Sequence, residues 1–141
     1  MQIKVGQVLS LRIRFNNSGD ISSTKHPYLV IKCIDNNTLE LAQFDKLRGK
    51  PWKAAFESNC VVYCDNPKET VIDEDSFIQM DNTIQIEYFD ELINYRRQED
   101  TLSEVKLNNV VKSYNEYHKN HHINEDKLVY MDKDEITNLN S

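Results

Sequence analysis

"YLVIKCIDNNTLELAQF", residues 28–44, carries the clearest secondary-structure signal in this chain. Its first seven residues are β-branched and almost continuously apolar, which predicts a strand covered on both faces. The "DNN" at 35–37 is a tight-turn signal, and strand character resumes directly after it. The sequence therefore predicts an antiparallel hairpin centred on residues 35–37.

Shorter strand segments lie on both sides of this hairpin. Upstream, "VLSLRIRF" at 8–15 alternates, with Leu9, Leu11, Ile13 and Phe15 on one face, which predicts a half-buried strand. A polar loop, expected to be mobile, occupies 16–25. Three more strand segments follow the hairpin: "CVVYC" at 60–64, "SFIQM" at 76–80 and "TIQIEYF" at 83–89. Five or six short strands in this order favour a mainly β fold, a small antiparallel barrel, over a β-α-β fold.

The periodicity changes after residue 100. Thr101 and Glu104 match a capping box, and apolar residues recur at helical spacing as far as Tyr117, which predicts a C-terminal helix from about 102 to 119. The remaining residues, 120–141, are highly polar. We expect a barrel with its C-terminal helix over 1–119, then a polar tail that is weakly ordered or carries a brief helix or strand.

Composition narrows the class of protein. The chain has 141 residues, 39% of them apolar, which suits one compact domain. It lacks a signal pattern and any apolar run near the roughly 18 residues that span a bilayer, so a soluble cytoplasmic protein without a membrane partner is expected. The three cysteines, at 33, 60 and 64, lack disulfide or zinc spacing and are expected to be reduced thiols.

The charge of the chain is unevenly distributed. The net charge is −6, yet residues 1–64 hold nine Lys/Arg against five Asp/Glu, while residues 65–141 hold eight against eighteen. An acidic protein binds polyanions poorly as a whole, but a local basic patch still attracts phosphates. The charge distribution therefore predicts that any anion-binding site lies in residues 1–64.

Common catalytic and metal motifs are missing from the sequence. It contains no glycine-rich phosphate loop and no G-x-S-x-G turn, which excludes the commonest nucleotide-dependent enzymes. His118, His121 and His122 lie close together, but no cysteine or carboxylate pattern completes a metal site. The acidic segments lack the ligand spacing of an EF-hand loop. No metal and no cofactor is expected.

Basic side chains flank the predicted hairpin. If the first three strands form one sheet, these side chains converge on a groove where phosphates meet cations and a base stacks on Trp52. The alternative is a solvated hairpin with Trp52 packed against the barrel wall. Lys25 and His26 precede the first hairpin strand, and the candidate nucleic-acid contacts are Arg12, Arg14, Lys46, Arg48, Lys50, Trp52 and Lys53.

Two segments resemble the opening of the MazF/PemK-like toxin family. These are "KVGQVLSLRIRF" at 4–15 and "KHPYLVIKCI" at 25–34, separated by a polar loop, as in that family. The later strands and the closing helix also follow the family order, so that the resemblance covers residues 3–118. It implies an SH3-like barrel with an appended helix, a homodimer, and a metal-independent endoribonuclease acting on single-stranded RNA as the toxin of a toxin-antitoxin pair.

The resemblance also implies a chemistry. In this family the RNA 2′-hydroxyl attacks the adjacent phosphorus and leaves a 2′,3′-cyclic phosphate, which requires a base, an acid and positive charge. The family places Arg before the proline, where this chain has His26. Imidazole transfers protons but lacks the guanidinium fork. Lys25 or Arg48 are candidates for restoring the charge. The small hydroxyl residue that the family has at the end of the third strand has no clear counterpart, and Gln43 nearby can hydrogen-bond a phosphate but cannot transfer protons. The candidate catalytic residues are therefore His26, Lys25 and Gln43.

Other functions remain open at the level of the sequence. The missing Arg is compatible with a non-catalytic SH3-like binding module, and related CcdB-like barrels act on a protein target such as gyrase. A basic groove for RNA would also attract a disordered acidic antitoxin, which can wrap a folded surface and mimic phosphates.

Overall fold

A computed structural model of the chain describes residues 2–141. Within these residues, seven strands form one mainly antiparallel sheet that is accompanied by helices. The strands are β1 (Val8–Leu11), β2 (His26–Ile34), β3 (Thr38–Lys46), β4 (Asn59–Val62), β5 (Ser76–Gln79), β6 (Thr83–Glu87) and β7 (Leu128–Met131). The α-helices are α1 (Glu104–Asn120) and α2 (Lys133–Leu139), and the 3-10 helices are η1 (Pro51–Ala55), η2 (Asp90–Tyr95) and η3 (Glu125–Lys127).

The predicted hairpin is confirmed as β2 and β3. Its turn contains Asp35 at φ 51° and Asn36 at φ 58°, the left-handed conformation that two-residue hairpin turns favour and that Asp and Asn tolerate. Pairing runs from Ile34 opposite Thr38 back to Tyr28 opposite Gln43. The turn residues therefore fix the register of the two longest strands next to the turn, before the shift between Val30 and Lys32.

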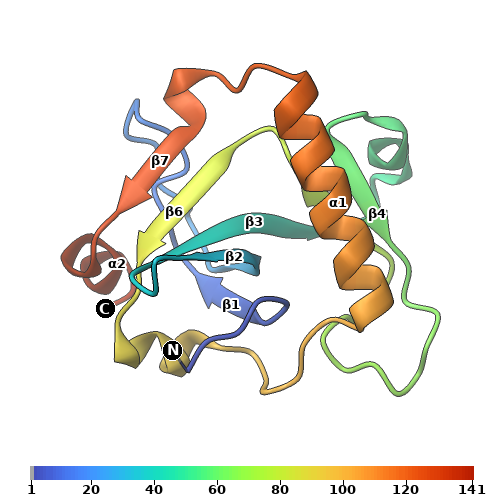
Figure 1. Cartoon of the computed structure of the whole chain (residues 1–141), viewed down its shortest axis with the longest axis horizontal. Helices are drawn as coiled ribbons and strands as arrows, with labels where there is room; N and C mark the ends of the chain where they lie inside the picture. Colours follow the sequence, from blue (N-terminus) through green and yellow to red (C-terminus); the bar gives the residue numbers. More distant parts are fainter. Residues whose placement is uncertain (1) are drawn as a thin grey trace.

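β3 lies at the centre of the sheet and divides it (Figure 1). Besides β2, its first half pairs with β6, from Thr38 opposite Glu87 to Leu41 opposite Ile84. Its second half pairs with β5, from Phe44 to Lys46. β4 extends the branch that contains β5, and β7 joins β6 in parallel. One strand thus belongs to two diverging parts of the sheet.

The hairpin separates two hydrophobic clusters. Alternate residues of β2 point to opposite sides: Tyr28 and Val30 belong to one cluster, Leu29 and Ile31 to the other, and all four are at most 2% exposed. The prediction of a strand covered on both faces is therefore confirmed for residues 28–31 and wrong for Cys33, which is exposed. A register shift between Val30 and Lys32 ends this alternation.

α1 covers the cluster that contains Leu29, with Val110 and Tyr114 buried beneath it. The predicted helix is confirmed, but its predicted capping box is wrong. Ser103 is the N-cap and makes no side-chain cap. Its backbone N–H donates instead to the Glu69 carboxylate over 2.9 Å, so a distant loop supplies the acceptor that a helix N-terminus needs.

The C-terminal segment differs from the weakly ordered tail that its polar sequence suggested. It contains β7 and α2, so that the alternative expectation of a brief strand or helix describes it better. Val129, Met131 and Ile136 are at most 3% exposed and belong to the same cluster as Tyr28. Three well-spaced apolar side chains suffice to bury this segment although its other residues are polar.

The sheet is mainly β as predicted, but it does not close. Among residues 2–141, β1 pairs along its length with β2 alone, and β7 pairs only with β6. Leu9, Leu11 and Ile13 share the buried face predicted for the first strand, whereas Phe15 is 41% exposed, because the strand ends at Leu11. No helix in the described part of the chain is long and apolar enough to cross a membrane.

Replacing Ile136 by Ala tests the packing of the C-terminal segment. Ile136 is fully buried, and removing such a side chain costs about 2–5 kcal/mol of unfolding free energy. Urea denaturation of Ile136→Ala should show this loss. Val105→Ala, at a residue 81% exposed, is the control and should stay within about 0.5 kcal/mol of wild type. Equal effects of the two changes would contradict the packing described.

The cap on α1 predicts a pH dependence of stability. Burial raises the pKa of Glu69, but the Lys106 ammonium at 2.6 Å and the Ser103 N–H outweigh it and hold that pKa below its ordinary value. A lowered folded pKa means that the stabilisation is complete above the unfolded value, about 4.3, and is lost as the pH falls through the folded value. Glu69→Gln should therefore cost about 1–2 kcal/mol at pH 7 and much less near pH 3.

Urea denaturation at both pH values measures this difference. Glu99→Gln is a matched control, because the Glu99 side chain is 90% exposed and lies 3.9 Å from its cationic neighbour. A Glu69→Gln penalty that is equal at pH 7 and pH 3 would contradict a charged cap.

Candidate functional site

Two pockets meet at His26, the first residue of β2. The first, named here the cationic pocket, has a volume of about 320 Å³ and lies between the hairpin and the segment 71–76. Four of its side chains are cationic and two are carboxylates. Its polar and charged lining residues are His26, Asp45, Lys46, Arg48, Lys50, Asp73, Ser76 and Arg97.

The second pocket, named here the amide pocket, has a volume of about 510 Å³. His26 and Tyr28 of β2 line it together with the amides of Gln43 and Gln79. Its remaining wall comes from the segment between β1 and β2, through Phe15, Ile21, Ser22 and Ser23. Burial raises the pKa of the Tyr28 phenol, so this hydroxyl stays protonated.

The hairpin explains why the two pockets share a residue. Because side chains alternate along a strand, Pro27 and Phe44 line the cationic pocket while Tyr28 and Gln43, which are register partners, line the amide pocket. His26 lies at the end of β2, opposite Leu11 of β1, and borders both. Pro27 holds the residue before it in extended backbone, which orients His26 at this rim.

Three of the four cations of the first pocket, Lys46, Arg48 and Lys50, are paired with carboxylates. The Lys50 ammonium lies 2.7 Å from the Asp45 carboxylate. The Lys46 ammonium and an Arg48 nitrogen both lie 3.5 Å from Oε2 of Glu74. Arg48 remains 80% exposed, so its guanidinium can turn towards an incoming anion. The pocket therefore has a positive net charge that the nearby carboxylates of Asp45 and Glu74 partly neutralise.

Glu74 is itself unusual. Its second carboxylate oxygen, Oε1, is buried and has no hydrogen-bond partner within residues 2–141. A buried unpaired carboxylate oxygen is costly, and the two cations on Oε2 compensate only part of that cost. Glu74 therefore sets the position of Lys46 and Arg48 from behind the pocket.

Several residues expected at the site lie elsewhere. Lys25 is exposed, with its ammonium 5.7 Å from the centroid of the Tyr95 ring, and lines neither pocket. The Arg12 side chain donates from Nε to the backbone oxygen of Ser22. Trp52 in η1 is 59% exposed and Lys53 lies over Phe56, and neither lines the two pockets, because η1 turns the chain away after Lys50. A stacking role of Trp52 at this site has no support.

Arg14 was expected to contact nucleic acid and instead has a structural role. All five N–H groups of its guanidinium donate within the protein: to both carboxylate oxygens of Glu135, to the backbone oxygens of Asn16 and Tyr130, and to the side-chain oxygen of Asn17. The guanidinium has five donors in total. No donor remains for a phosphate.

Three contributors were missed by sequence reasoning. Arg97 reaches the cationic pocket because its backbone N–H donates to Val8 of β1, a contact without a local sequence signal. Glu74 and Gln79 belong to the turn before β5 and to β5 itself, which only the pairing with β3 brings near the site. The acidic "DED" at 73–75 is visible in the sequence, but no local signal indicates that the Glu74 carboxylate contacts Lys46 and Arg48.

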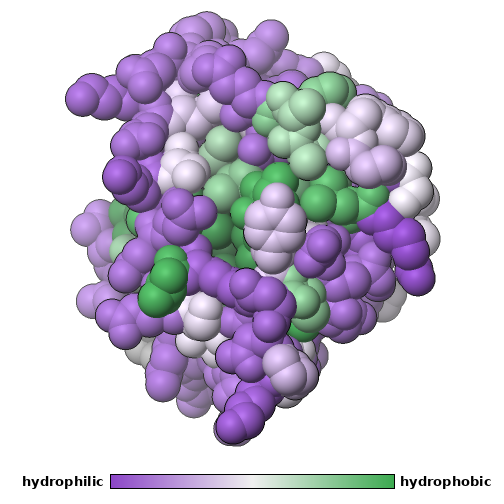
Figure 2. Space-filling view, turned by 90° about the vertical axis from the view of Figure 1, so that its right-hand side faces the viewer, coloured by the Kyte–Doolittle hydropathy of each residue, from purple (hydrophilic) through white to green (hydrophobic). Residues whose placement is uncertain are grey.

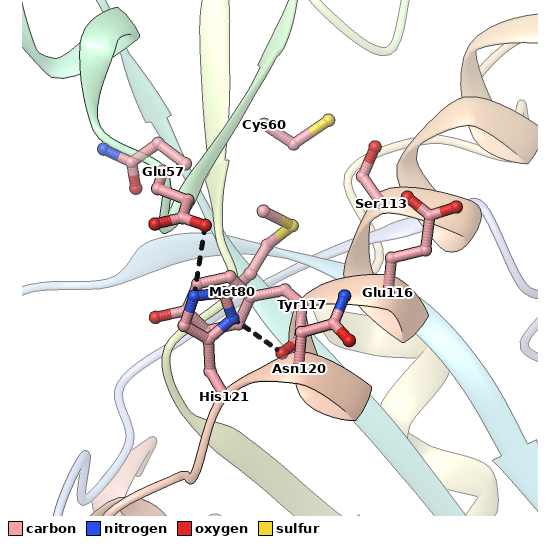
Figure 3. Close-up of a pocket in the computed structure, with 9 residues that line it drawn as sticks. Glu57, Cys60, Met80, Ser113, Glu116, Tyr117, Asn120 and His121 are labelled. Carbon is pink, nitrogen blue, oxygen red and sulfur yellow. Dashed lines mark hydrogen bonds and ion pairs between the residues drawn. The ribbon is translucent and has the colours of Figure 1, made fainter.

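A third pocket lies between α1 and β4 on the far side of η1 and is less suited to an anion. Figure 2 shows apolar side chains gathered in the middle of this face within a hydrophilic ring. In Figure 3 the Cys60 sulfur lies towards Ser113, while His121 occupies the other end beside Glu57. The pocket also contains Glu116. Burial raises the pKa of the Cys60 thiol, so the pocket offers neither a thiolate nor a net positive charge.

The three C-terminal histidines do not converge. His118 stacks on Tyr114, with Nε2 2.8 Å from the Met80 oxygen, and His121 pairs with Glu57 at 3.2 Å. In the part of the chain that the structure describes, no group of three or more His, Cys, Asp or Glu side chains is placed to hold a metal ion. The three cysteines are free thiols.

The chain was compared with family models, curated proteins and solved structures. No family model, no curated protein and no solved structure matches the chain.

Removing the carboxylate of Glu74 should increase anion binding at the cationic pocket. Glu74→Gln removes the carboxylate that Lys46 and Arg48 share and raises the net charge by one. The affinity for a single-stranded DNA of about 12 nucleotides should therefore rise roughly two- to fivefold at low salt. Fluorescence anisotropy measures the change. Glu57→Gln removes an equal charge beside the third pocket and should have a smaller effect, and equal gains would contradict binding at the cationic pocket.

Proposed function

We propose that this protein is a metal-independent endoribonuclease that cuts single-stranded RNA. The observation that carries the proposal is the junction at His26, where a group able to transfer a proton borders both a cationic pocket and an amide pocket. Cations suit a phosphate, and amides suit the edge of a base. The proposal agrees with the resemblance of residues 3–118 to the MazF/PemK-like toxins.

The proposed reaction begins at the imidazole of His26. This group takes the proton of the RNA 2′-hydroxyl, whose oxygen forms a bond to the adjacent phosphorus, while the bond from phosphorus to the 5′-oxygen breaks. Arg48 and Arg97 stabilise the added negative charge on the phosphorus, and the ammonium of Lys46 protonates the departing oxygen. The products are a 2′,3′-cyclic phosphate and a 5′-hydroxyl. Gln43 orients the nucleotide through hydrogen bonds and transfers no proton.

The finer architecture and the partners belong to the same proposal. We propose that the branched sheet is a variant of the SH3-like barrel of that family, and that the protein acts as a homodimeric cytoplasmic toxin restrained by an acidic antitoxin. An acidic peptide suits the cationic pocket for the reason that RNA does, because both supply anionic groups to Lys46, Arg48 and Arg97.

A non-catalytic binding module is the competing function, and one observation favours it. The ion pairs of Lys46, Lys50 and Arg48 with carboxylates satisfy much of the charge that a phosphoryl clamp requires. A module of this kind would bind a partner at the same pocket without cutting RNA.

Cleavage of a mixed RNA pool in EDTA tests the proposal. Wild type should produce cyclic-phosphate ends, and His26→Ala should lower the single-turnover rate about 100-fold or more, because it removes the proton acceptor. His26→Arg introduces the guanidinium that the resembling family has at this position and that imidazole lacks. Lys53→Ala, outside both pockets, is the control and should keep the wild-type rate.

The outcome separates the two functions. If wild type and His26→Ala cleave equally slowly while both bind RNA with the same salt dependence, the binding module is the better description. If cleavage requires a divalent metal, the proposed chemistry is wrong.

A further inference from the structure

Besides the pairing of β7 with β6, the segment 125–140 has a second set of polar contacts with another part of the chain. That part is the segment 12–18, which leads from β1 into the wall of the amide pocket. Arg12 and Asn140 exchange two hydrogen bonds, from the Arg12 N–H to Oδ1 of Asn140 and from Nδ2 of Asn140 to the Arg12 oxygen. The resemblance to the toxin family ends at residue 118, so these contacts involve a segment outside it.

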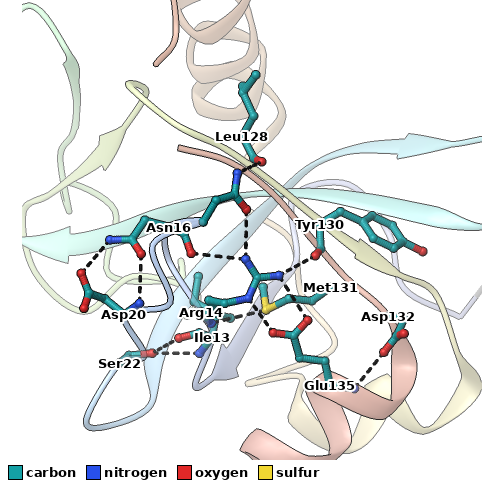
Figure 4. Close-up of polar contacts among 11 residues, drawn as sticks. Ile13, Arg14, Asn16, Asp20, Ser22, Leu128, Tyr130, Met131, Asp132 and Glu135 are labelled. Atoms are coloured by element: carbon teal, nitrogen blue, oxygen red, sulfur yellow. Dashed lines mark hydrogen bonds and ion pairs between the residues drawn. The ribbon is translucent and has the colours of Figure 1, made fainter. Parts of the chain in front are cut away.

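Arg14 joins the two segments at a single point. Figure 4 shows its guanidinium between Glu135 and the backbone of Tyr130. The bond from Nε to the Glu135 carboxylate is 2.7 Å long, and that from Nη2 to the Tyr130 oxygen is 2.9 Å. A guanidinium whose five donors are all occupied is held in one orientation, so it ties residue 14 to both β7 and α2.

Asn17 continues the connection at the tip of the loop. Its backbone N–H donates to the Asp126 oxygen over 2.8 Å, and its side-chain nitrogen donates to the backbone oxygens of Glu125 and Leu128. Its side-chain oxygen accepts from Arg14. Ser18 adds a bond to the Asp126 carboxylate.

Contacts within residues 13–22 connect the anchored residues to the wall of the amide pocket. Arg14 pairs with Ile21, and the Phe15 N–H donates to Asp20. The Ser22 hydroxyl exchanges two hydrogen bonds with the backbone of Ile13. Residues 13–22 thus form a small hairpin-like turn in which the anchored side fixes the position of the other side. That other side supplies Ile21, Ser22 and Ser23 to the amide pocket.

We propose that residues 125–140 form a clamp that positions the 15–23 wall of the amide pocket, with Arg14 and Asn17 as the positioning residues. Both residues act on a bound nucleotide only through the wall that they hold. The consequence for RNA turnover rests on the proposed function, whereas the consequence for the order of the wall does not.

Hydrogen exchange and kinetics on the full chain test the clamp together. Asn17→Ala removes two hydrogen bonds donated to the backbone of 125–128 and the acceptor for Arg14. Amides of residues 15–22 should therefore exchange about tenfold faster, while those of β3 stay unchanged. In cleavage of a single-stranded RNA, KM should rise about fivefold and kcat should stay within about twofold, because the reacting groups remain in place. Asn17→Asp, which keeps the acceptor for Arg14, should fall between wild type and Asn17→Ala.

Asn138→Ala is the matched control. Asn138 is an exposed residue of α2, and its replacement should leave exchange and KM at the wild-type values. Unchanged exchange of 15–22 in Asn17→Ala overturns the clamp, and faster exchange with an unchanged KM overturns its positioning role.

If wild type does not cleave RNA, the proposed function is wrong, but the clamp can still be tested. The clamp is then decided by exchange and by the dissociation constant for single-stranded DNA, which Asn17→Ala should raise about fivefold.

Discussion

The pairing of β3 with three partners is the constraint from which the site follows. One edge of β3 pairs along β2, and its other edge is shared, first by β6 and then by β5. The sheet must diverge where β6 ends and β5 begins, close to Ala42 and Gln43. A diverging sheet leaves space on both sides of the hairpin end, and the two pockets lie there. The polar and charged residues of the two pockets lie close together because β3 pairs first with β6 and then with β5.

Burial explains why the central strand can be shared in this way. Leu39 and Leu41 are packed in one cluster, and Ala42 and Phe44 in the other, so neither face of β3 can move to solvent without exposing apolar side chains. Glu40 is the exception on this strand. It is 5% exposed and accepts hydrogen bonds from the Tyr114 hydroxyl at 2.6 Å and from Gln85 at 2.9 Å. A buried carboxyl group with these partners fixes α1 over the hairpin, because slippage would leave its buried oxygens without hydrogen-bond donors.

The sequence was informative where the signal is local. Continuous β-branched residues and the "DNN" turn predicted the hairpin, and the hairpin alone brings His26 and Gln43 to one pocket and Lys46 to the other. It was uninformative where position depends on a distant contact. No residue near Arg97 in the sequence indicates that its backbone N–H donates to Val8. Likewise, no residue near Arg14 indicates that its guanidinium donates to the Glu135 carboxylate. The helix cap was misassigned for the same reason, because Glu69 lies 34 residues from Ser103 in the chain. The C-terminal segment was underestimated because its three buried side chains are dispersed among charged ones.

The ion pairs of the cationic pocket are best understood as a consequence of the charge of the chain. A protein of net charge −6 that concentrates Lys46, Arg48, Lys50 and Arg97 in one hollow incurs mutual repulsion among them, and nearby carboxylates relieve it in the unliganded state. Asp45 and Glu74 then compete with an incoming phosphate, which lowers affinity but holds the cations in place before the phosphate arrives. A bound phosphate, or the phosphorane of the proposed reaction, must displace the Glu74 carboxylate from Lys46 and Arg48, so the ion pairs lower the affinity of the pocket under either function.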